Sequence, residues 1–368
     1  MKYYRLDRIE KTAPAAKYYM IFGERSNGKT YAVIEKGMKQ YVKTGKQFAI
    51  VRRWAEDIRG SKGATMLDNL VCNQKGVNTI KKLTKGKFDR VVYRSRAWYL
   101  AYFDEELNKM ILDVKPCAYA FSLNEYEHYK SNSYPYIELV LFDEFMSKEG
   151  YINDEFINFQ HVLSTIIRHK DSVKIYMCAN TVSKYCPYFG EMGITNARTM
   201  KQGSIDVYKY GDSGLQVAVE YADGDPEGKP SDVYFAFQNP KLKLITQGSW
   251  QIDIYPHIRA TFEKKDILFT YFVIFEEDTL QCEIVNKDNM LFTYVHVKTT
   301  PIKDDKKDII FQVQPVEDRN VYTNLLYPSD ELSKKITYFY KANKVFYQSN
   351  EIGEIMNHYL NTCKQVVR

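Results

Sequence analysis

A short run near the N-terminus limits what this chain can fold into more than any other feature. It reads G-x-x-x-x-G-K-T, and its residues are Gly23, Glu24, Arg25, Ser26, Asn27, Gly28, Lys29 and Thr30. The apolar run Tyr18–Phe22 precedes it, and a segment able to begin a helix follows it. Glycines let the backbone approach a phosphate, and successive N–H groups then point inward as a nest. The pattern therefore predicts a strand, a phosphate-binding loop and a helix, and not a surface turn.

A second apolar run ends in two carboxylates. Ile137–Phe142 is suited to a central strand, and Asp143 and Glu144 follow it. In open α/β sheets, ligands bind at the carboxyl ends of the strands. We expect Lys29 to reach the β- and γ-phosphates of a nucleotide, and we expect Thr30 and Asp143 to hold Mg²⁺. Glu144 is then placed to polarise an attacking water. An isolated strand that ends in Asp-Glu is usually structural, so this assignment depends on the phosphate loop.

Two further polar residues follow predicted elements. Asn180 comes after the predicted strand Val173–Ala179, where it either hydrogen-bonds a γ-phosphate or the attacking water, or caps a turn. Arg168 ends the predicted helix Asp154–Arg168. It either complements the dipole at the helix C-terminus or reaches the nucleotide of a neighbouring subunit.

Several basic residues allow more than one interpretation. Arg25 lies in the phosphate loop and Arg52-Arg53 closes the predicted strand Gln47–Arg52, so these residues contact phosphate, bridge subunits or are solvated. Arg53 is an inter-subunit candidate on this basis. A lysine-rich segment either follows a nucleic-acid backbone or forms a solvated loop. Its DNA-binding candidates are Lys81, Lys82, Lys85 and Lys87.

The organisation of the chain predicts two domains, since 368 residues exceed the usual size of one. From Met20 to Asn180, apolar strands alternate with amphipathic segments, which favours an α/β fold with a mostly parallel sheet. We expect an ATPase-type domain at 1–197, a connector rich in turn residues at 198–240, and a smaller α+β domain at 241–368. Further expected strands are Phe88–Tyr93, Trp98–Phe103, Ala118–Ser122, Asp266–Phe275, Leu280–Asn286, Met290–Val297 and Ile309–Gln314, and the expected helices of the second domain are Asp330–Lys341 and Glu351–Lys364.

The composition of the chain indicates its cellular environment and its possible partners. The net charge of +6 is compatible with a polyanionic partner but does not require one. The six cysteines are scattered without a C-x-x-C pair, which indicates a reducing cytosol. No secretion signal is visible, and the longest apolar run, near Ile267–Phe275, is about half the length that spans a bilayer. We therefore expect no membrane partner.

With these residues placed, the chain resembles the DNA-encapsidation ATPases of phi-29-like podoviruses. The resemblance follows an ordered series of blocks from about Met20 to Phe189: F-G-E-R-S-N-G-K-T-Y, Q-F-A-I-V-R-R, Y-K-S-N-S-Y-P, L-V-L-F-D-E-F, I-I-R-H-K-D-S-V-K-I-Y-M-C-A-N-T-V-S and P-Y-F. The phosphate loop and the Asp-Glu pair are generic, and the other blocks are more particular. Beyond Phe189 the resemblance rests on length and strand order.

The resemblance implies an ASCE-type P-loop ATPase that uses ATP and Mg²⁺ to move double-stranded DNA into a procapsid through its portal. Such proteins resemble terminases and form a homo-oligomeric ring, thought to be a pentamer, at the portal vertex in the host cytoplasm. Lys29, Thr30, Asp143 and Glu144 match the nucleotide and hydrolysis residues of the family. Arg168 matches its trans-acting arginine finger, Asn180 its sensor-like asparagine, and Lys130 a lysine thought to act between subunits. Use of a packaging RNA stays open.

The resemblance also implies that the C-terminal domain is similar to an RNase H-type nuclease that has lost its catalytic acids. The available carboxylates are Asp266, Glu276, Glu277, Asp278 and Glu283. Two-metal cleavage needs several carboxylates that converge on a pair of ions. We expect Glu276-Glu277-Asp278 to lie in a hairpin turn that faces solvent, and we therefore expect no nuclease activity.

Three other functions compete with this interpretation. A P-loop phosphotransferase for a small molecule would need a closed acceptor pocket. A translocase of a conjugation or replication system would share the ATP site without a portal. A non-enzymatic assembly protein with a decayed site is disfavoured by the intact Lys29, Asp143 and Glu144.

Overall fold

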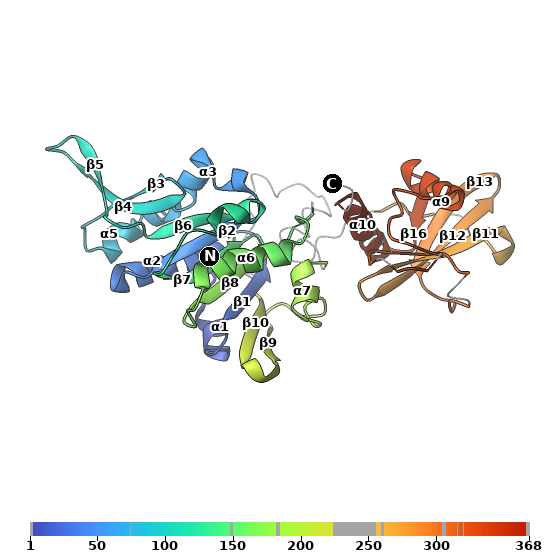
Figure 1. Ribbon diagram of the computed structural model, residues 1–368, viewed down its shortest axis with the longest axis horizontal. Coiled ribbons are helices and arrows are strands. Elements are labelled where there is room, and N and C mark those ends of the chain that lie inside the picture. Colours follow the sequence, from blue (N-terminus) through green and yellow to red (C-terminus); the bar gives the residue numbers. More distant parts are fainter. Residues whose placement is uncertain are drawn as a thin grey trace. The chain divides into compact units, whose positions relative to one another are not determined.

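The computed structural model divides the chain into two compact units, Met1–Trp250 and Gln251–Arg368, and each is described by itself (Figure 1). The described residues are 3–73, 75–147, 150–181, 185–223, 255–258, 261–303, 307–314, 316–318 and 320–365.

The described residues of the first unit form a ten-stranded sheet in the order β3-β4-β6-β2-β7-β8-β1-β10-β9, with β5 paired to β4. Its strands are β1 Tyr18–Gly23, β2 Gln47–Arg52, β3 Arg90–Arg94, β4 Ala97–Asp104, β5 Lys109–Leu112, β6 Ala118–Ser122, β7 Ile137–Asp143, β8 Lys174–Asn180, β9 Ile205–Tyr210 and β10 Leu215–Tyr221. The six central strands, β6 to β10 in this order, run parallel, and β9, β3, β4 and β5 pair antiparallel at the edges. The predicted mostly parallel α/β fold is confirmed.

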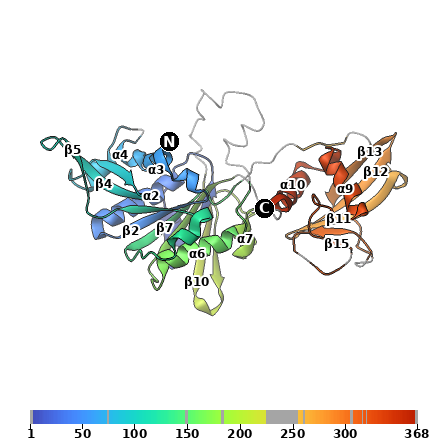
Figure 2. The same cartoon turned by 45° about the horizontal axis from the view of Figure 1, so that its top comes forward.

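Helices cover both faces of this sheet. They are α1 Asp7–Thr12, α2 Lys29–Thr44, α3 Gly60–Thr65, α4 Asp68–Val71, α5 Thr79–Leu83, α6 Glu155–Ile167 and α7 Pro187–Glu191, and 3₁₀ turns lie at Ala55–Asp57, Leu123–Tyr129 and Gly211–Ser213. Because side chains alternate along a strand, β1 sends Met20 and Phe22 into one core and Tyr19 and Ile21 into the other. The first core packs against α6 and α7 and the second against α2, and Figure 2 shows these helices on opposite sides of the sheet.

The first unit extends further along the chain than the expected boundary at 197. Residues 205–221, expected within the connector 198–240, form β9 and β10, and β10 pairs with β1 in parallel. Val217 and Val219 of β10 are fully buried in the core beneath the sheet. The glycines around this hairpin indicate turns but not the strands between them. For this reason the sequence places the domain boundary too early. The rest of the expected connector, 224–240, lies outside the described residues.

The described residues of the second unit include a six-stranded sheet in the order β15-β14-β11-β12-β13-β16. Its elements are β11 Ile267–Phe275, β12 Asp278–Lys287, β13 Met290–Val297, β14 Ile310–Gln312, β15 Val321–Tyr322, β16 Val345–Tyr347, α9 Glu331–Lys341, α10 Asn350–Gln365 and a 3₁₀ turn at Lys264–Asp266. Strands β11, β12 and β13 form an antiparallel meander, and β14 runs parallel to β11. Glu276 and Glu277 lie exposed in the turn between β11 and β12, as expected, whereas Asp278 begins β12.

Gly37 of α2 is a sensitive point of packing in the first unit. A Cβ atom there would lie 2.7 Å from Cγ of the buried Phe48 ring on β2. We predict that Gly37→Ala destabilises the protein by about 1–3 kcal/mol through this overlap, although alanine favours helix. Gly190→Ala is the matched control, because Gly190 lies in α7 with open space around its Cβ position. Urea unfolding measures both, and equal stability of the two variants would contradict this account.

Candidate active site

The phosphate loop joins β1 to α2 and requires glycine at both ends. Gly28 has a φ of 92°, in the left-handed region that strains other residues. At Gly23, where φ is 157°, an added Cβ would lie 3.1 Å from the carbonyl oxygen of Ala222 on the neighbouring chain segment. The start of the loop thus lies against the end of β10. At both glycines the backbone carries no side chain that would block the approach of a ligand.

Lys29, the first residue of α2, is buried and bonded to its own loop. Its Nζ donates to the carbonyl oxygens of Glu24, at 2.5 Å, and Gly23, at 3.3 Å, and to Oδ1 of Asn27, at 3.1 Å. Burial lowers the pKa of Lys29 to about 8, against the opposing effect of Cys178, Asp143 and Glu24. The loop therefore folds around an ammonium group that lacks a full counter-charge.

Asn27 leaves a buried donor in the same loop. Its Oδ1 accepts from Lys29, but its Nδ2 is buried and has no hydrogen-bond partner among the described residues. Buried polar atoms are almost always hydrogen-bonded, so an orphan of this kind points to a missing acceptor. Phosphate oxygens are acceptors only. The loop residues therefore fit the phosphates of a nucleotide.

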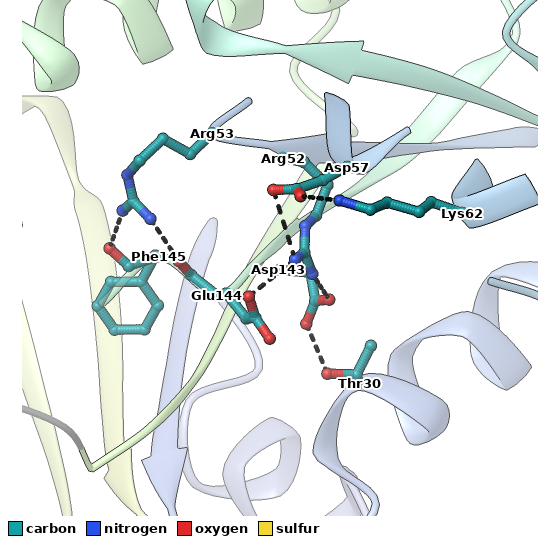
Figure 3. A network of polar contacts seen from close by, with 8 residues as sticks. All are labelled: Thr30, Arg52, Arg53, Asp57, Lys62, Asp143, Glu144 and Phe145. Carbon is teal, nitrogen blue, oxygen red and sulfur yellow. Dashed lines mark hydrogen bonds and ion pairs between the residues drawn. The ribbon is translucent and has the colours of Figure 1, made fainter. Parts of the chain in front are cut away.

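The acidic end of β7 meets the start of α2 (Figure 3). Thr30 Oγ1 donates to Oδ1 of Asp143 over 2.6 Å, and Arg52 Nη1 donates to Oδ2 of the same carboxylate over 2.5 Å. Arg52 also donates to Glu144 Oε2 over 2.7 Å and lies 3.8 Å from Asp57. A hydroxyl and a carboxylate in contact are ligands that Mg²⁺ accepts, together with phosphate oxygens and water. The pair Thr30 and Asp143 therefore fits this ion.

Glu144 combines an exposed side chain with a constrained backbone. Its side chain is 58% exposed, and its φ of 60° is left-handed. The backbone N–H groups of Glu144 and Phe145 both donate to the carbonyl oxygen of Cys178 on β8. The carboxylate is therefore accessible, while its main chain is fixed to the adjacent strand.

Asn180 lies at the same edge of the sheet. It is the last residue of β8 and pairs in register with Gly23, and the next N–H, of Thr181, donates to the Gly23 carbonyl. Its side chain is half-buried. The structure thus brings Asn180 beside the phosphate loop.

Arg168 and Lys130 lie together at a different place. Both are exposed and line a cavity of about 350 Å³ with His161, Ser164 and Thr165. Arg168 Nη2 donates to the carbonyl of Asn132, in the segment that leads into β7. Helix α6 separates Arg168 from the Glu144 turn, and its 13 residues span roughly 20 Å. Arg168 is therefore remote from the phosphate loop of its own chain.

The other basic candidates divide into exposed and buried residues. Arg25 is exposed in the phosphate loop, and Lys81, Lys82, Lys85 and Lys87 are exposed on α5 and the loop after it. Arg53, in contrast, is buried and bonds to Glu155 and to the main chain within its own subunit. This geometry leaves Arg53 unable to reach across to another subunit.

Sequence reasoning missed two contacts in this site, the bridge from Arg52 to both carboxylates and the pair Arg53–Glu155. The adjacency of β2 and β7 was the signal available for the first, because Arg52 ends one strand and Asp143 the other. No local pattern marks Glu155 as the partner of Arg53.

In the second unit, two of the carboxylates considered in the sequence analysis contact other side chains. Asp266 contacts Lys287, and Glu283 contacts Gln281 and His296. Among the described residues, no group of three His, Cys, Asp or Glu side chains is arranged to hold a metal ion. Within the described part of the chain, no helix has both the length and the apolar character needed to cross a bilayer.

Together these features define an ASCE-type P-loop fold, in which β8 lies between the phosphate-loop strand β1 and the acidic strand β7. The comparisons with known proteins agree with this class. A family model described as podovirus DNA encapsidation protein (Gp16) matches residues 102–202. The DNA packaging protein of Bacillus phage B103 is 26% identical over 177 residues, and that of Bacillus phage phi29 is 25% identical over 173. The resemblance expected from the sequence is confirmed.

These matches have defined limits. The aligned part covers 47% of this chain and 47% of the B103 protein, and 46% of this chain and 44% of the phi29 protein, so the chain spans about half the length of the curated relatives it matches. A chain of the bacteriophage Phi-29 viral genome packaging motor assembly superposes over 99% of this chain and 100% of its own, with a TM-score of 0.56 and 17% identity. A chain of the Phi-28 gp11 DNA packaging motor superposes with a TM-score of 0.50 and 17% identity, with 98% of both chains covered. At this identity the superpositions show the fold alone.

The lowered pKa of Lys29 predicts a pH dependence of nucleotide binding. With a pKa of about 8 in the free protein, Lys29 loses its proton progressively as the pH rises through 8. A bound phosphate favours the charged form, so binding must then take up a proton. We predict that ADP affinity falls as the pH rises from about 7 to about 9, and that proton uptake grows over the same range.

Calorimetry in buffers of different ionisation enthalpy measures this uptake directly. Near pH 6.5 the uptake by Lys29 itself should be close to zero, because its amine is already charged there. An observed enthalpy that is independent of the buffer near pH 8.5 would contradict the prediction.

Proposed function

We propose that this chain is the ATPase subunit of a phage genome-packaging motor, which hydrolyses ATP to move double-stranded DNA through a portal into a procapsid. One observation carries the proposal. Lys29, the contact between Thr30 and Asp143, and the exposed Glu144 meet at one edge of a parallel sheet, in a chain similar to DNA packaging proteins. The fold alone would allow many P-loop functions.

Each residue of the site has a proposed role. The loop N–H groups and Lys29 bind the β- and γ-phosphates, with Asn27 as an added donor. Mg²⁺, held through Thr30 and Asp143, would neutralise charge on the phosphate oxygens. Glu144 orients and polarises the attacking water, and Asn180 hydrogen-bonds that water or the γ-phosphate. Arg25, which is exposed in the loop, would contact phosphate.

The position of Arg168 supports action in trans within a homo-oligomeric ring. Because α6 holds it roughly 20 Å from the Glu144 turn, Arg168 is suited to the nucleotide of a neighbouring subunit. Lys130 lines the same cavity and would act at the same interface. We propose that the ring is a pentamer, and mass measurement with a non-hydrolysable ATP analogue tests this number of subunits.

DNA is held in this proposal mainly through its phosphates. Lys81, Lys82, Lys85 and Lys87 are the candidate contacts, and binding should then be nearly independent of sequence and strongly dependent on salt. The partners are duplex DNA and the portal, at the procapsid vertex in the host cytoplasm. Involvement of a packaging RNA is tested by adding the RNA to a packaging assay.

We further propose that the second unit is a nuclease-like domain without nuclease activity. The meander β11–β12–β13, with β14 parallel to β11 and β15 parallel to β14, follows the strand order of RNase H-type folds. The central strand β11, Ile267–Phe275, carries no carboxylate. Incubation with duplex DNA and Mn²⁺ tests this, and metal-dependent cleavage would contradict it.

ATPase rates with and without duplex DNA separate the motor from its rivals. A small-molecule phosphotransferase or an assembly protein would show no stimulation by DNA. A conjugation or replication translocase would be stimulated, but it would not fill procapsids in a packaging assay.

Glu144→Gln should separate nucleotide binding from hydrolysis. We predict unchanged ATP affinity and a turnover about 10²–10⁴ lower, because the amide cannot accept the proton of water. Glu35→Gln is the matched control, since Glu35 is a carboxylate of α2 paired with Lys39 on the surface. Lys29→Ala should instead lose binding. Normal turnover of Glu144→Gln would refute the assignment of the base.

Mixing two inactive variants tests action in trans. Subunits with Arg168→Ala keep a complete Glu144 site, and subunits with Glu144→Gln keep the arginine, so mixed rings should regain part of the ATPase activity. The control mixes Arg168→Ala with a double variant that carries both changes, which has neither group to contribute. Equal activity in the two mixtures would argue against a shared site.

A further inference from the structure

The side chains of Arg52 and Arg53, at the end of β2, point to opposite faces of the sheet. Along β2, Ile50 packs in the core beside α2 and Val51 in the core beside α6. The alternation continues past the strand, so Arg52 faces the carboxylates beside α2 and Arg53 faces the side of α6 (Figure 3). The two neighbours therefore serve different parts of the site.

Arg53 uses its whole guanidinium group inside the protein. Its Nε donates to Glu155 Oε2 over 2.7 Å, and Nη2 donates to Glu155 Oε1 over 2.8 Å. On its other side, Nη2 donates to the carbonyl of Phe145 over 2.8 Å and Nη1 to the carbonyl of Glu144 over 3.1 Å. The side chain is 7% exposed, so these contacts are made away from bulk water.

Glu155 is equally well satisfied. Besides Arg53, it accepts from the Tyr188 hydroxyl over 2.9 Å and from the N–H of Ile152 over 2.9 Å, and its side chain is 1% exposed. A buried ion pair contributes little to stability unless its remaining hydrogen bonds are made, and here they are. A buried pair whose hydrogen bonds are all made is suited to holding the groups around it in one arrangement.

The geometry that is fixed is the main chain at Glu144. A left-handed φ in a non-glycine residue costs of order 1–3 kcal/mol and persists only where the surroundings impose it. At Glu144 the N–H groups are held by the Cys178 carbonyl, and the carbonyls of Glu144 and Phe145 are held by Arg53. Both polar sides of this strained turn are therefore clamped.

We propose that Arg53, held by Glu155, is a positioning residue that fixes the main chain of Glu144 and so presents its carboxylate for hydrolysis. The role in hydrolysis rests on the proposed function. Because Glu155 is the first residue of α6, the same contact also fixes the N-terminus of the helix that Arg168 follows. Arg53 itself does not touch the nucleotide.

The test is Arg53→Lys, which keeps the charge but not the fork of donors. We expect ATP affinity to change by less than about twofold, because the phosphate loop makes no contact with Arg53, and we expect kcat to fall by about tenfold or more. Arg96→Lys is the chemical control, since Arg96 bonds Glu125 and the Tyr129 hydroxyl elsewhere in the first unit. Gly37→Ala controls for a general loss of stability, and both controls should keep kcat.

Hydrogen exchange without nucleotide gives a second readout that does not depend on enzymatic activity. In Arg53→Lys, the amides of Glu144 and Phe145 should exchange faster than in the wild type, while those of α2 stay unchanged. If the wild type fails to hydrolyse ATP, the proposed function fails. The exchange rates still show whether Arg53 fixes the main chain at Glu144. Unchanged exchange together with a kcat within about twofold of the wild type would overturn the proposal.

Tyr188→Phe covers the case in which Arg53→Lys does not fold. It removes one donor to Glu155 and leaves the ring that packs in the core. We expect a smaller fall in kcat and a smaller rise in the exchange of the Glu144 and Phe145 amides. Wild-type values for both would likewise overturn the clamp.

Discussion

The hydrogen bond between Thr30, at the start of α2, and Asp143, at the end of β7, connects the phosphate loop to the acidic strand. Strand β8 separates β1 from β7, and the side chain of Thr30 at the start of α2 reaches across to the acidic strand. Arg52 strengthens this junction by bonding Asp143 and Glu144 together. The proposed site depends on this junction, because an ammonium beside phosphates and a metal-binding carboxylate would act on the same ligand only when they are held at one edge.

The same edge carries free energy costs that a ligand relieves. Lys29 is buried without a full counter-charge, which lowers its pKa, and the Nδ2 of Asn27 is buried without a partner among the described residues. A polyphosphate supplies both the negative charge and the acceptor. Burial of these groups thus prepares the loop for its ligand, and part of the binding free energy comes from removing an unfavourable arrangement in the free protein.

How far the sequence predicted this structure depends on how local each signal is. The loop 23–30 and the strands around it were predictable, because each signal is a short local pattern. The glycines lie within one loop, and the Asp-Glu pair directly follows its own apolar run. The strand β10 was not, since its flanking glycines are typical of a connector and its burial depends on pairing with β1. Arg53 was noted as an inter-subunit candidate, but its partner Glu155 lies on another element, and only the folded chain brings the two together.

The alternation of side chains along β2 explains why adjacent arginines do different work. Arg52 holds the carboxylate of Glu144 from the side of α2, while Arg53 holds the main chain of Glu144 from the side of α6. Exposed ion pairs break readily, whereas a buried, fully bonded pair does not. The carboxylate of Glu144 is therefore able to leave Arg52 for a water while its backbone stays in place. The proposed role of Glu144 in hydrolysis needs this division, because its side chain would exchange partners during each cycle while its position must not drift.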